Sequence, residues 1–203
     1  MKIVPILIIV SFFALGAVKA EYRAPYPLNE NEKSEYISKK YYEIVGIRIN
    51  KVSLEDISKI LGESEIYKGT HTASHVCYKN KSEKLEFTVS SLGYGYTVSQ
   101  YDSGPNKCSE LEREFINNAG LKVGLTKSEV ISLAGDPSKK TDSRFTYIFW
   151  VQEKPENEVE ERLRKVHKIP VSEEIWLDVY SVIDVEFKGG LVRMYSVHTT
   201  ETY

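Results

Sequence analysis

Cysteine and histidine are the side chains whose chemistry needs explaining first. The chain has two cysteines and four histidines among 203 residues. No known cysteine-nucleophile motif surrounds Cys77 or Cys108, and two cysteines in an exported chain usually pair. We therefore predict a disulfide between them. On the chain-entropy model, such a cross-link stabilises the folded state by roughly 3–4 kcal/mol.

His71 and His75 are four residues apart, the spacing at which two imidazoles on one helix can share a metal ion. The residues around them do not predict a helix, and no HExxH or CxxC motif is present, so we interpret this stretch as a surface loop. The sequence also lacks a G-x-S-x-G nucleophile motif and the context of a phosphate-binding glycine loop. We expect no enzymatic activity, no metal and no cofactor.

Aromatic residues are the more promising candidates for binding. The chain has 14 tyrosines, and several aromatics alternate along expected strands. Tyrosine and tryptophan are enriched where proteins bind one another, whereas the alternative is that they fill the core. The candidate partner-binding residues are Tyr94, Tyr96, Tyr101, Tyr147, Trp150, Trp176 and Tyr180.

The first twenty residues have the order of a secretory signal peptide. Lys2 provides a positive start, residues 3–18 are almost wholly apolar, and Val18-Lys19-Ala20 offers small residues at the −3 and −1 positions. An uncleaved anchor is the alternative, although the apolar run is shorter than a spanning helix needs. We expect cleavage after Ala20, no membrane span in the mature chain, and a periplasmic or secreted location.

Composition and charge narrow the class of partner. The chain is 41% hydrophobic and 28% charged, which is the balance of a globular protein. Its formal net charge of −2 provides no basic surface for a phosphate backbone. A nucleic-acid partner is therefore not expected.

An internal repeat organises the rest of the chain. Residues 52–62 and 125–135 each predict a short helix that is N-capped by a hydroxyl, Ser53 or Thr126, and ended by a glycine. An acidic residue follows each cap by three positions, as in a capping box. Chance likeness between two short capped helices is the alternative interpretation.

Further elements are expected around both copies. Capping patterns predict a helix before each copy, at 29–42 and at 109–120. Alternating residues predict strands after each copy, and Gly189-Gly190 predicts a hairpin turn between the last two. The expected strands are 74–78, 85–90, 94–101, 144–151, 175–180, 182–188 and 191–199.

These elements predict an α+β fold class. Two tandem helix-helix-antiparallel-sheet units, in residues 21–104 and 105–203, would form one compact bilobed protein. A charged insertion at 152–174 carries an apolar stripe at helical spacing. It is either a solvated helical excursion or a partner-binding arm.

The second copy resembles a known family. Residues 123–137 are similar to the G-x-[ST]-x-x-[DE]-V…G-x-P signature of the SmpA/OmlA (BamE-like) outer-membrane assembly proteins, and residues 185–192 resemble the hairpin that ends their unit. The resemblance covers 109–198 well and 29–101 loosely. A duplicated and exported unit of this kind implies a β-lactamase-inhibitor-like fold and a protein-binding role.

The leading hypothesis is an exported, non-enzymatic inhibitor or immunity protein that occludes a toxin or an envelope hydrolase. An envelope-assembly accessory of the SmpA/OmlA type is the first alternative, and a small secreted hydrolase is the second. Asn80-Lys81-Ser82 also forms an N-glycosylation sequon, which matters only in a eukaryotic host.

Overall fold

The structure is a computed structural model that describes residues 22–24, 31–68, 74–91, 95–101 and 108–202. Its helices are α1 (Leu54–Leu61), α2 (Lys127–Ala134) and α3 (Asn157–His167), with 3₁₀ turns η1 (Lys39–Tyr41) and η2 (Ile49–Lys51). Its strands are β1 (Tyr22–Arg23), β2 (Glu43–Ile44), β3 (Ile47–Arg48), β4 (Tyr67–Lys68), β5 (Ser74–Asn80), β6 (Leu85–Ser90), β7 (Gly95–Gln100), β8 (Ser109–Glu110), β9 (Lys139–Lys140), β10 (Arg144–Glu153), β11 (Leu177–Lys188) and β12 (Leu191–Thr202).

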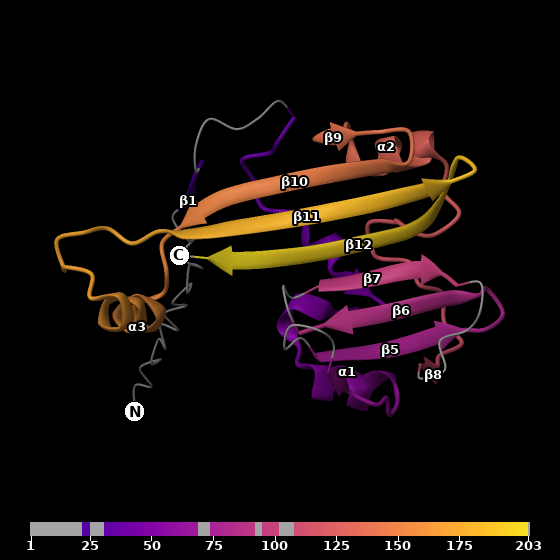
Figure 1. The fold of residues 1–203 in the computed structure, drawn as a ribbon, viewed down its shortest axis with the longest axis horizontal. Coiled ribbons are helices and arrows are strands. Elements are labelled where there is room, and N and C mark those ends of the chain that lie inside the picture. The colour runs from indigo at the N-terminus through magenta and orange to yellow at the C-terminus, as the bar shows by residue number, and fades with distance from the viewer. Residues whose placement is uncertain (1–21, 25–30, 69–73, 92–94, 102–107, 203) are drawn as a thin grey trace, which may run out of the picture.

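One large sheet dominates the described chain. Its strands follow the order β1-β10-β11-β12-β7-β6-β5-β4, with β9 added to β10 and β8 added in parallel to β5, while β2 and β3 form a separate hairpin. Helix α1 precedes the meander β5-β6-β7, and α2 precedes the meander β10-β11-β12. The last strands of the two meanders, β7 and β12, pair antiparallel, so the six long strands lie side by side (Figure 1).

The expected α+β architecture of two helix-helix-sheet units is therefore wrong. Within the described residues the protein is mostly β, and the strands of both halves belong to a single sheet. The helix expected at 29–42 is replaced from residue 31 onward by extended chain and the short turn η1. The physical reason is pairing with the sheet: the Lys33 amide donates to Ile148 O, and Lys33 O accepts from the Trp150 amide, each at 3.0 Å.

The helix expected at 109–120 is also absent. Ser109 and Glu110 pair in parallel with β5 instead, and the Ser109 hydroxyl donates to Glu63 O rather than capping a helix. Farther on, the Asn117 side chain accepts from the amides of Ala119 and Leu121, which holds a turn. Sheet pairing and a side-chain-stabilised turn satisfy these backbone groups, so the local helix signal is overridden.

The helices expected at the repeat are confirmed. Ser53 Oγ accepts from the Asp56 amide at 3.1 Å, and Thr126 forms a complete capping box with Glu129. Gly62 and Gly135 follow the helices at φ +106° and +77°, positive values that glycine adopts without steric cost. The hairpin at Gly189-Gly190 is present too, although the strands expected at 175–180 and 182–188 form one strand, β11.

The core lies on one face of the sheet, which we call the inner face. Alternate residues of each long strand point there and pack against apolar residues of α1 and α2, because side chains alternate along a strand. Ile57 of α1 and Val130 of α2 are fully buried in this layer. Fully buried inner-face residues include Val76, Tyr78, Phe87, Val98, Phe145, Tyr147, Ile183, Val185, Tyr195 and Val197.

The charged insertion projects from the end of the sheet. It contains α3, which lies beyond the ends of β10 and β11 and away from α1 and α2 (Figure 1). None of the residues in α3 is buried, and Arg164 ties the helix to the returning loop through Pro170 O and Glu173 O. No helix in the described part of the chain is long and apolar enough to cross a membrane.

Candidate functional site

The face of the sheet opposite the core is the candidate site, and we call it the open face. Cross-strand pairing arranges its side chains in rows that run across the six long strands. The hydroxyl row consists of Thr146, Asp184, Ser196, Thr97, Thr88 and Cys77. The histidine row consists of Ile148, Val182, His198, Gly95, Ser90 and His75, and the aromatic row of Trp150, Tyr180 and Thr200.

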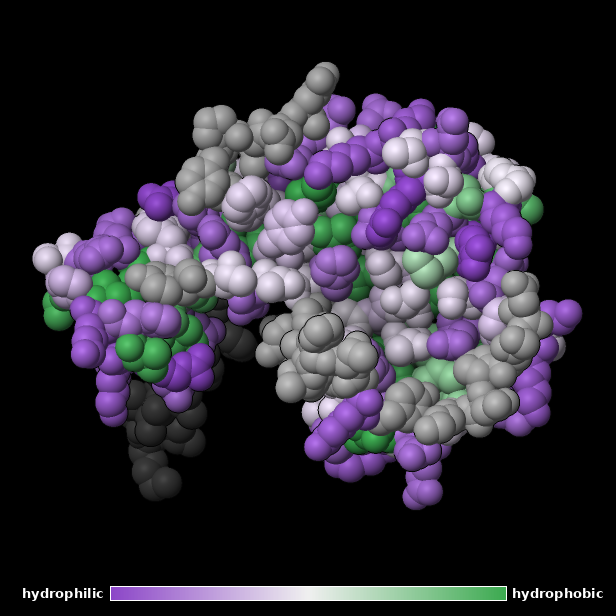
Figure 2. All heavy atoms as spheres, in the orientation of Figure 1, coloured by the Kyte–Doolittle hydropathy of each residue, from purple (hydrophilic) through white to green (hydrophobic). Residues whose placement is uncertain are grey.

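Figure 2 shows this face with pale spheres over the middle of the sheet and purple, charged residues around them. The pale colour marks residues of intermediate hydropathy. Two adjoining hollows of about 460 and 400 Å³ lie on the face. His198 lines both, so it stands at their junction.

The first hollow contains a fixed charge cluster. Arg144 contacts both oxygens of Asp184, through Nε at 3.1 Å and a terminal nitrogen at 2.9 Å, and the Thr146 hydroxyl donates to the same carboxylate at 2.6 Å. The hydrogen bond to Asp184 raises the pKa of Arg144. Together these donors hold the Asp184 carboxylate in place as part of the wall of the hollow.

The second hollow owes its shape to Gly95. A methyl group added there would lie 2.5 Å from Val197 O and from His198 Cβ. Strand β7 can therefore pass close to β12 only because this position has no side chain. Ser90 and Gly95, which are paired neighbours, leave open space beside the His198 ring.

His198 is half-buried between the two hollows. Burial lowers the pKa of its imidazole, and the Asp184 carboxylate opposes this change. The ring is consequently neutral at neutral pH, with one nitrogen able to donate and the other able to accept a hydrogen bond. It can recognise either a donor or an acceptor on a ligand.

Trp150 and Tyr180 form the aromatic end of the open face. Their rings meet edge to face, with centroids 5.8 Å apart and planes at 87°. Both side chains are half-buried, so part of each ring faces solvent. Burial raises the pKa of Tyr180, which keeps its hydroxyl protonated at neutral pH. Two of the seven aromatic candidates thus lie together on an accessible surface.

Tyr96 and Tyr147 lie in the core instead, where only 3% and 0% of each residue is exposed. The Tyr96 hydroxyl donates to Tyr41 O and accepts from Asn117 Nδ2, and burial raises its pKa. Desolvation likewise raises the pKa of Tyr147. These two tyrosines close the core, as the alternative interpretation of the aromatics anticipated, and a partner cannot reach them.

The remaining aromatic candidates are dispersed. Trp176 lies before β11. The Arg23 guanidinium of β1 lies 4.0 Å from the centre of its ring, and Lys154 Nζ of the insertion lies 5.3 Å from it. The Trp176 ring is therefore already in contact with two cations of the same chain. Tyr101 is half-buried just after β7, and its amide donates to Lys84 O. Tyr94 lies outside the described residues, as does His71 of the histidine pair.

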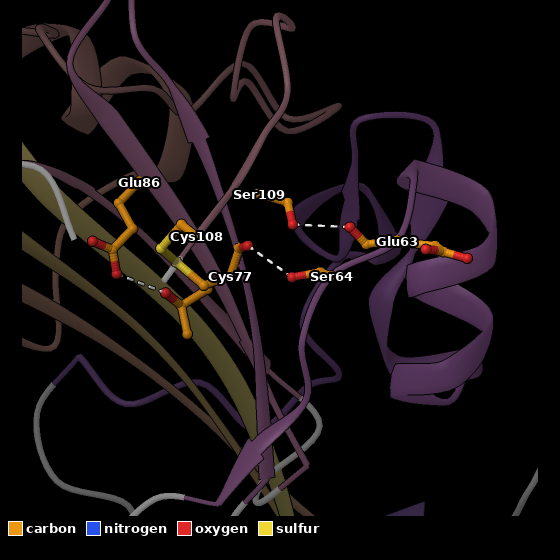
Figure 3. The surroundings of a disulfide bond; sticks show 7 residues. Glu63, Ser64, Cys77, Glu86, Cys108 and Ser109 are labelled. Carbon is orange, nitrogen blue, oxygen red and sulfur yellow. Dashed lines mark hydrogen bonds between the residues drawn. A yellow bond between two sulfur atoms is a disulfide. The ribbon is translucent and has the colours of Figure 1, made fainter. Parts of the chain in front are cut away.

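The disulfide between Cys77 and Cys108 is present, as predicted. Figure 3 shows it beside Glu86, with Ser64 and Ser109 hydrogen-bonded on the other side of β5. Both half-cystines are buried, and the bond covers one end of the hydroxyl row. The disulfide therefore stiffens the edge of the open face.

Asn80 of the sequon is buried and engaged. Its amide nitrogen donates to Arg113 O, and its oxygen accepts from the Ser82 hydroxyl and the Glu83 amide. Only 4% of the residue is exposed. A glycan on this nitrogen would displace those contacts, so the folded chain does not offer Asn80 as an acceptor.

Several residues of the open face escaped the sequence analysis. Thr97, Ser196 and His198 form its centre, yet none belongs to a motif. Their alternation with buried residues is visible in the sequence and places each on one face of its strand. What the sequence did not show is that β7 neighbours β12, because that contact joins residues about a hundred positions apart.

The segments that resemble the SmpA/OmlA family form the N-terminal cap of α2 and the hairpin between β11 and β12. Both are local structures that capping and turn chemistry explain. Comparisons of the chain with family models, with curated proteins and with solved structures find no match.

Proposed function

We propose that this protein is an exported, non-enzymatic binding protein that uses its open face to occlude another envelope or secreted protein. The supporting observation is a continuous, hollowed sheet face that no described helix covers and that carries a half-buried aromatic pair beside fixed polar groups. Interfaces between proteins are enriched in tyrosine, tryptophan and arginine and have polar rims. A toxin or an envelope hydrolase is the class of partner we propose.

Rigidity also supports this role. The open face is built on paired strands, its charges are held by hydrogen bonds, and a disulfide closes one edge. A preorganised surface loses little conformational entropy on binding, which reduces one of the costs of association.

Site-specific photo-crosslinking in the organism that makes the protein tests the proposal. A photoreactive phenylalanine analogue at Tyr180 or Thr97, both on the open face, should form a discrete adduct with one partner. The same analogue at Lys59 of α1, which is exposed on the other side of the core, is the matched control. Equal adducts from Lys59, or none from the open face, would overturn the proposal.

A variant that removes the aromatic pair tests how much the pair contributes to the binding free energy. Replacing both Trp150 and Tyr180 by alanine removes the aromatic pair without touching the inner face. Removing interface hot spots typically costs about 2 kcal/mol or more each, so the adduct yield from Thr97 should fall at least tenfold. A double variant of exposed positions on α1, Glu55→Ala with Lys59→Ala, should leave the yield unchanged.

A further inference from the structure

Three ligand atoms converge at the disulfide end of the open face. The sulfurs of Cys77 and Cys108 and a carboxylate oxygen of Glu86 all lie within 4.8 Å of one another. Cys77 comes from β5, Glu86 from β6, and Cys108 from the residue that precedes β8 (Figure 3). This group belongs to neither hollow of the open face.

The convergence does not depend on the sulfur–sulfur bond alone. Ser109 and Glu110 pair with Tyr78 and Lys79 of β5, and the Leu111 amide donates to Lys79 O at 2.9 Å. The Ser109 hydroxyl adds a bond to Glu63 O. These backbone contacts would hold Cys108 beside Cys77 after reduction, with the cysteine Cα atoms starting 4.7 Å apart.

Glu86 is positioned as well. It lies on the same side of the sheet as Cys77, since Cys77 pairs with Thr88 and Lys79 pairs with Glu86 in neighbouring rows. The Thr88 hydroxyl donates to Glu86 Oε1 at 3.0 Å and so orients the carboxylate. An outer hydrogen bond of this kind is what fixes ligating carboxylates in metal sites.

The donor atoms of the reduced cluster suit a divalent cation. Two cysteine sulfurs with one carboxylate oxygen are a donor set that Zn²⁺ accepts. Three protein ligands leave the fourth tetrahedral position for water.

We propose that the reduced chain binds a divalent ion of the zinc class through Cys77, Cys108 and Glu86. The metal ion and the disulfide are then alternative cross-links between the same two cysteines. The proposal goes beyond the binding function and does not rely on it, because it concerns the reduced chain and the binding function concerns the chain with its disulfide intact.

The chemistry balances with a phosphine as the reductant. The phosphine attacks one sulfur, the S–S bond breaks, and water supplies the oxygen of the phosphine oxide and the two protons of the thiols. Metal binding then releases those two protons.

Cobalt titration of the reduced full-length mature chain tests the site. The protein is reduced with a water-soluble phosphine, freed of it without oxygen, and titrated with Co²⁺. Thiolate-to-cobalt absorption in the near ultraviolet should rise to one equivalent, and Zn²⁺ should abolish it. The oxidised protein and the variant C77S with C108S should give no such absorption.

The variant Glu86→Gln distinguishes a metal site that uses the Glu86 carboxylate from metal binding by the two thiols alone. The amide is nearly isosteric but a poor zinc ligand, so affinity should fall by roughly tenfold or more. Glu110→Gln, an exposed acid on β8, is the matched control and should bind as the wild type does. Equal affinities of the Glu86→Gln variant and the wild type would overturn the proposal.

Unfolding of the reduced chain must be separated from loss of the site. Circular dichroism and urea titration of the reduced protein, with and without Zn²⁺, provide the second readout. Zn²⁺ should raise the urea midpoint, or restore the native spectrum, in the wild type and in Glu110→Gln, and it should do so less in Glu86→Gln. A Zn²⁺ effect that is absent from the wild type would also refute the site.

Discussion

His198 is the residue on which the open face is centred, and its environment makes it sensitive to pH. It lines both hollows, is half-buried, and faces Asp184 of β11, which is itself held by Arg144 and Thr146 of β10. Burial lowers the pKa of His198, so the folded state prefers the neutral ring. The unfolded chain, whose histidine titrates near 6.5, then binds a proton more readily than the folded one.

The expected consequence is a loss of stability in mild acid. The stabilising contribution of neutral His198 is complete above about pH 6.5 and falls as the pH drops through the lower folded pKa. In His198→Gln, the decrease in the urea midpoint between about pH 7.5 and pH 5.5 should therefore be smaller than in the wild type. His167→Gln, on the exposed helix α3, is the control. A decrease of the same size in His198→Gln and the wild type would contradict this assignment.

Among the elements, α2 depends more on its ends than α1 does. Only Val130 of this helix is fully buried, and Leu133 is 41% exposed, so tertiary packing contributes less than for α1, which buries Leu54, Ile57 and Leu61. The capping box satisfies the first amides. At the other end, Lys33 Nζ donates to Ala134 O, where a cation suits the helix dipole.

Thr126→Ala should consequently destabilise the protein. Loss of an N-cap hydroxyl typically costs about 1 kcal/mol. Here the Glu129 carboxylate, which accepts from the Thr126 amide, also loses the hydrogen bond from the Thr126 hydroxyl. Urea unfolding measures the change. Ser132→Ala is the matched control, because that hydroxyl bonds back to Ser128 O within the helix and should be nearly neutral. If both variants unfold at the same midpoint, α2 does not rely on its cap.

At the scale of the whole molecule, the contact between β7 and β12 turns two meanders into one sheet. Four residue pairs join these strands, from Met194 with Ser99 to Val197 with Tyr96. The core is correspondingly continuous, since the Tyr96 and Tyr195 rings meet edge to face across the junction. The second hollow of the open face requires this junction, because its lining combines Gly95 and Thr97 of β7 with His198 of β12.

Gly95→Ala tests the junction directly. The added methyl would overlap Val197 O and His198 Cβ, so the strands must separate locally. Overpacking of this kind costs roughly 1–3 kcal/mol, which a urea titration resolves. Ser99→Ala, on the open face of the same strand, should change stability by less than about 0.5 kcal/mol. Wild-type stability in Gly95→Ala would mean that β7 does not approach β12 this closely.

The sequence by itself determined the local structures of this protein. The caps at Ser53 and Thr126, the turn at Gly189-Gly190, the alternation of the long strands and the pairing of the two cysteines all follow from neighbouring residues or from the count of cysteines. Such features depend on backbone groups a few positions apart, which makes them readable from residue types and spacing. Of the seven aromatic residues that the sequence indicated as candidates for binding, Trp150 and Tyr180 lie together on the open face.

Only the tertiary structure decided which strands are neighbours. The pairing of those strands in turn decides which residues meet at the candidate site. The segments 31–42 and 109–120 carry helix signals, yet sheet pairing of Lys33 and of Ser109 satisfies the backbone there more effectively. The same long-range pairing sent Tyr96 and Tyr147 to the core, set His198 against Gly95, and brought Glu86 to the two cysteines. These contacts join residues far apart in the chain, so no local pattern encodes them, and they arise from the burial of one whole sheet face.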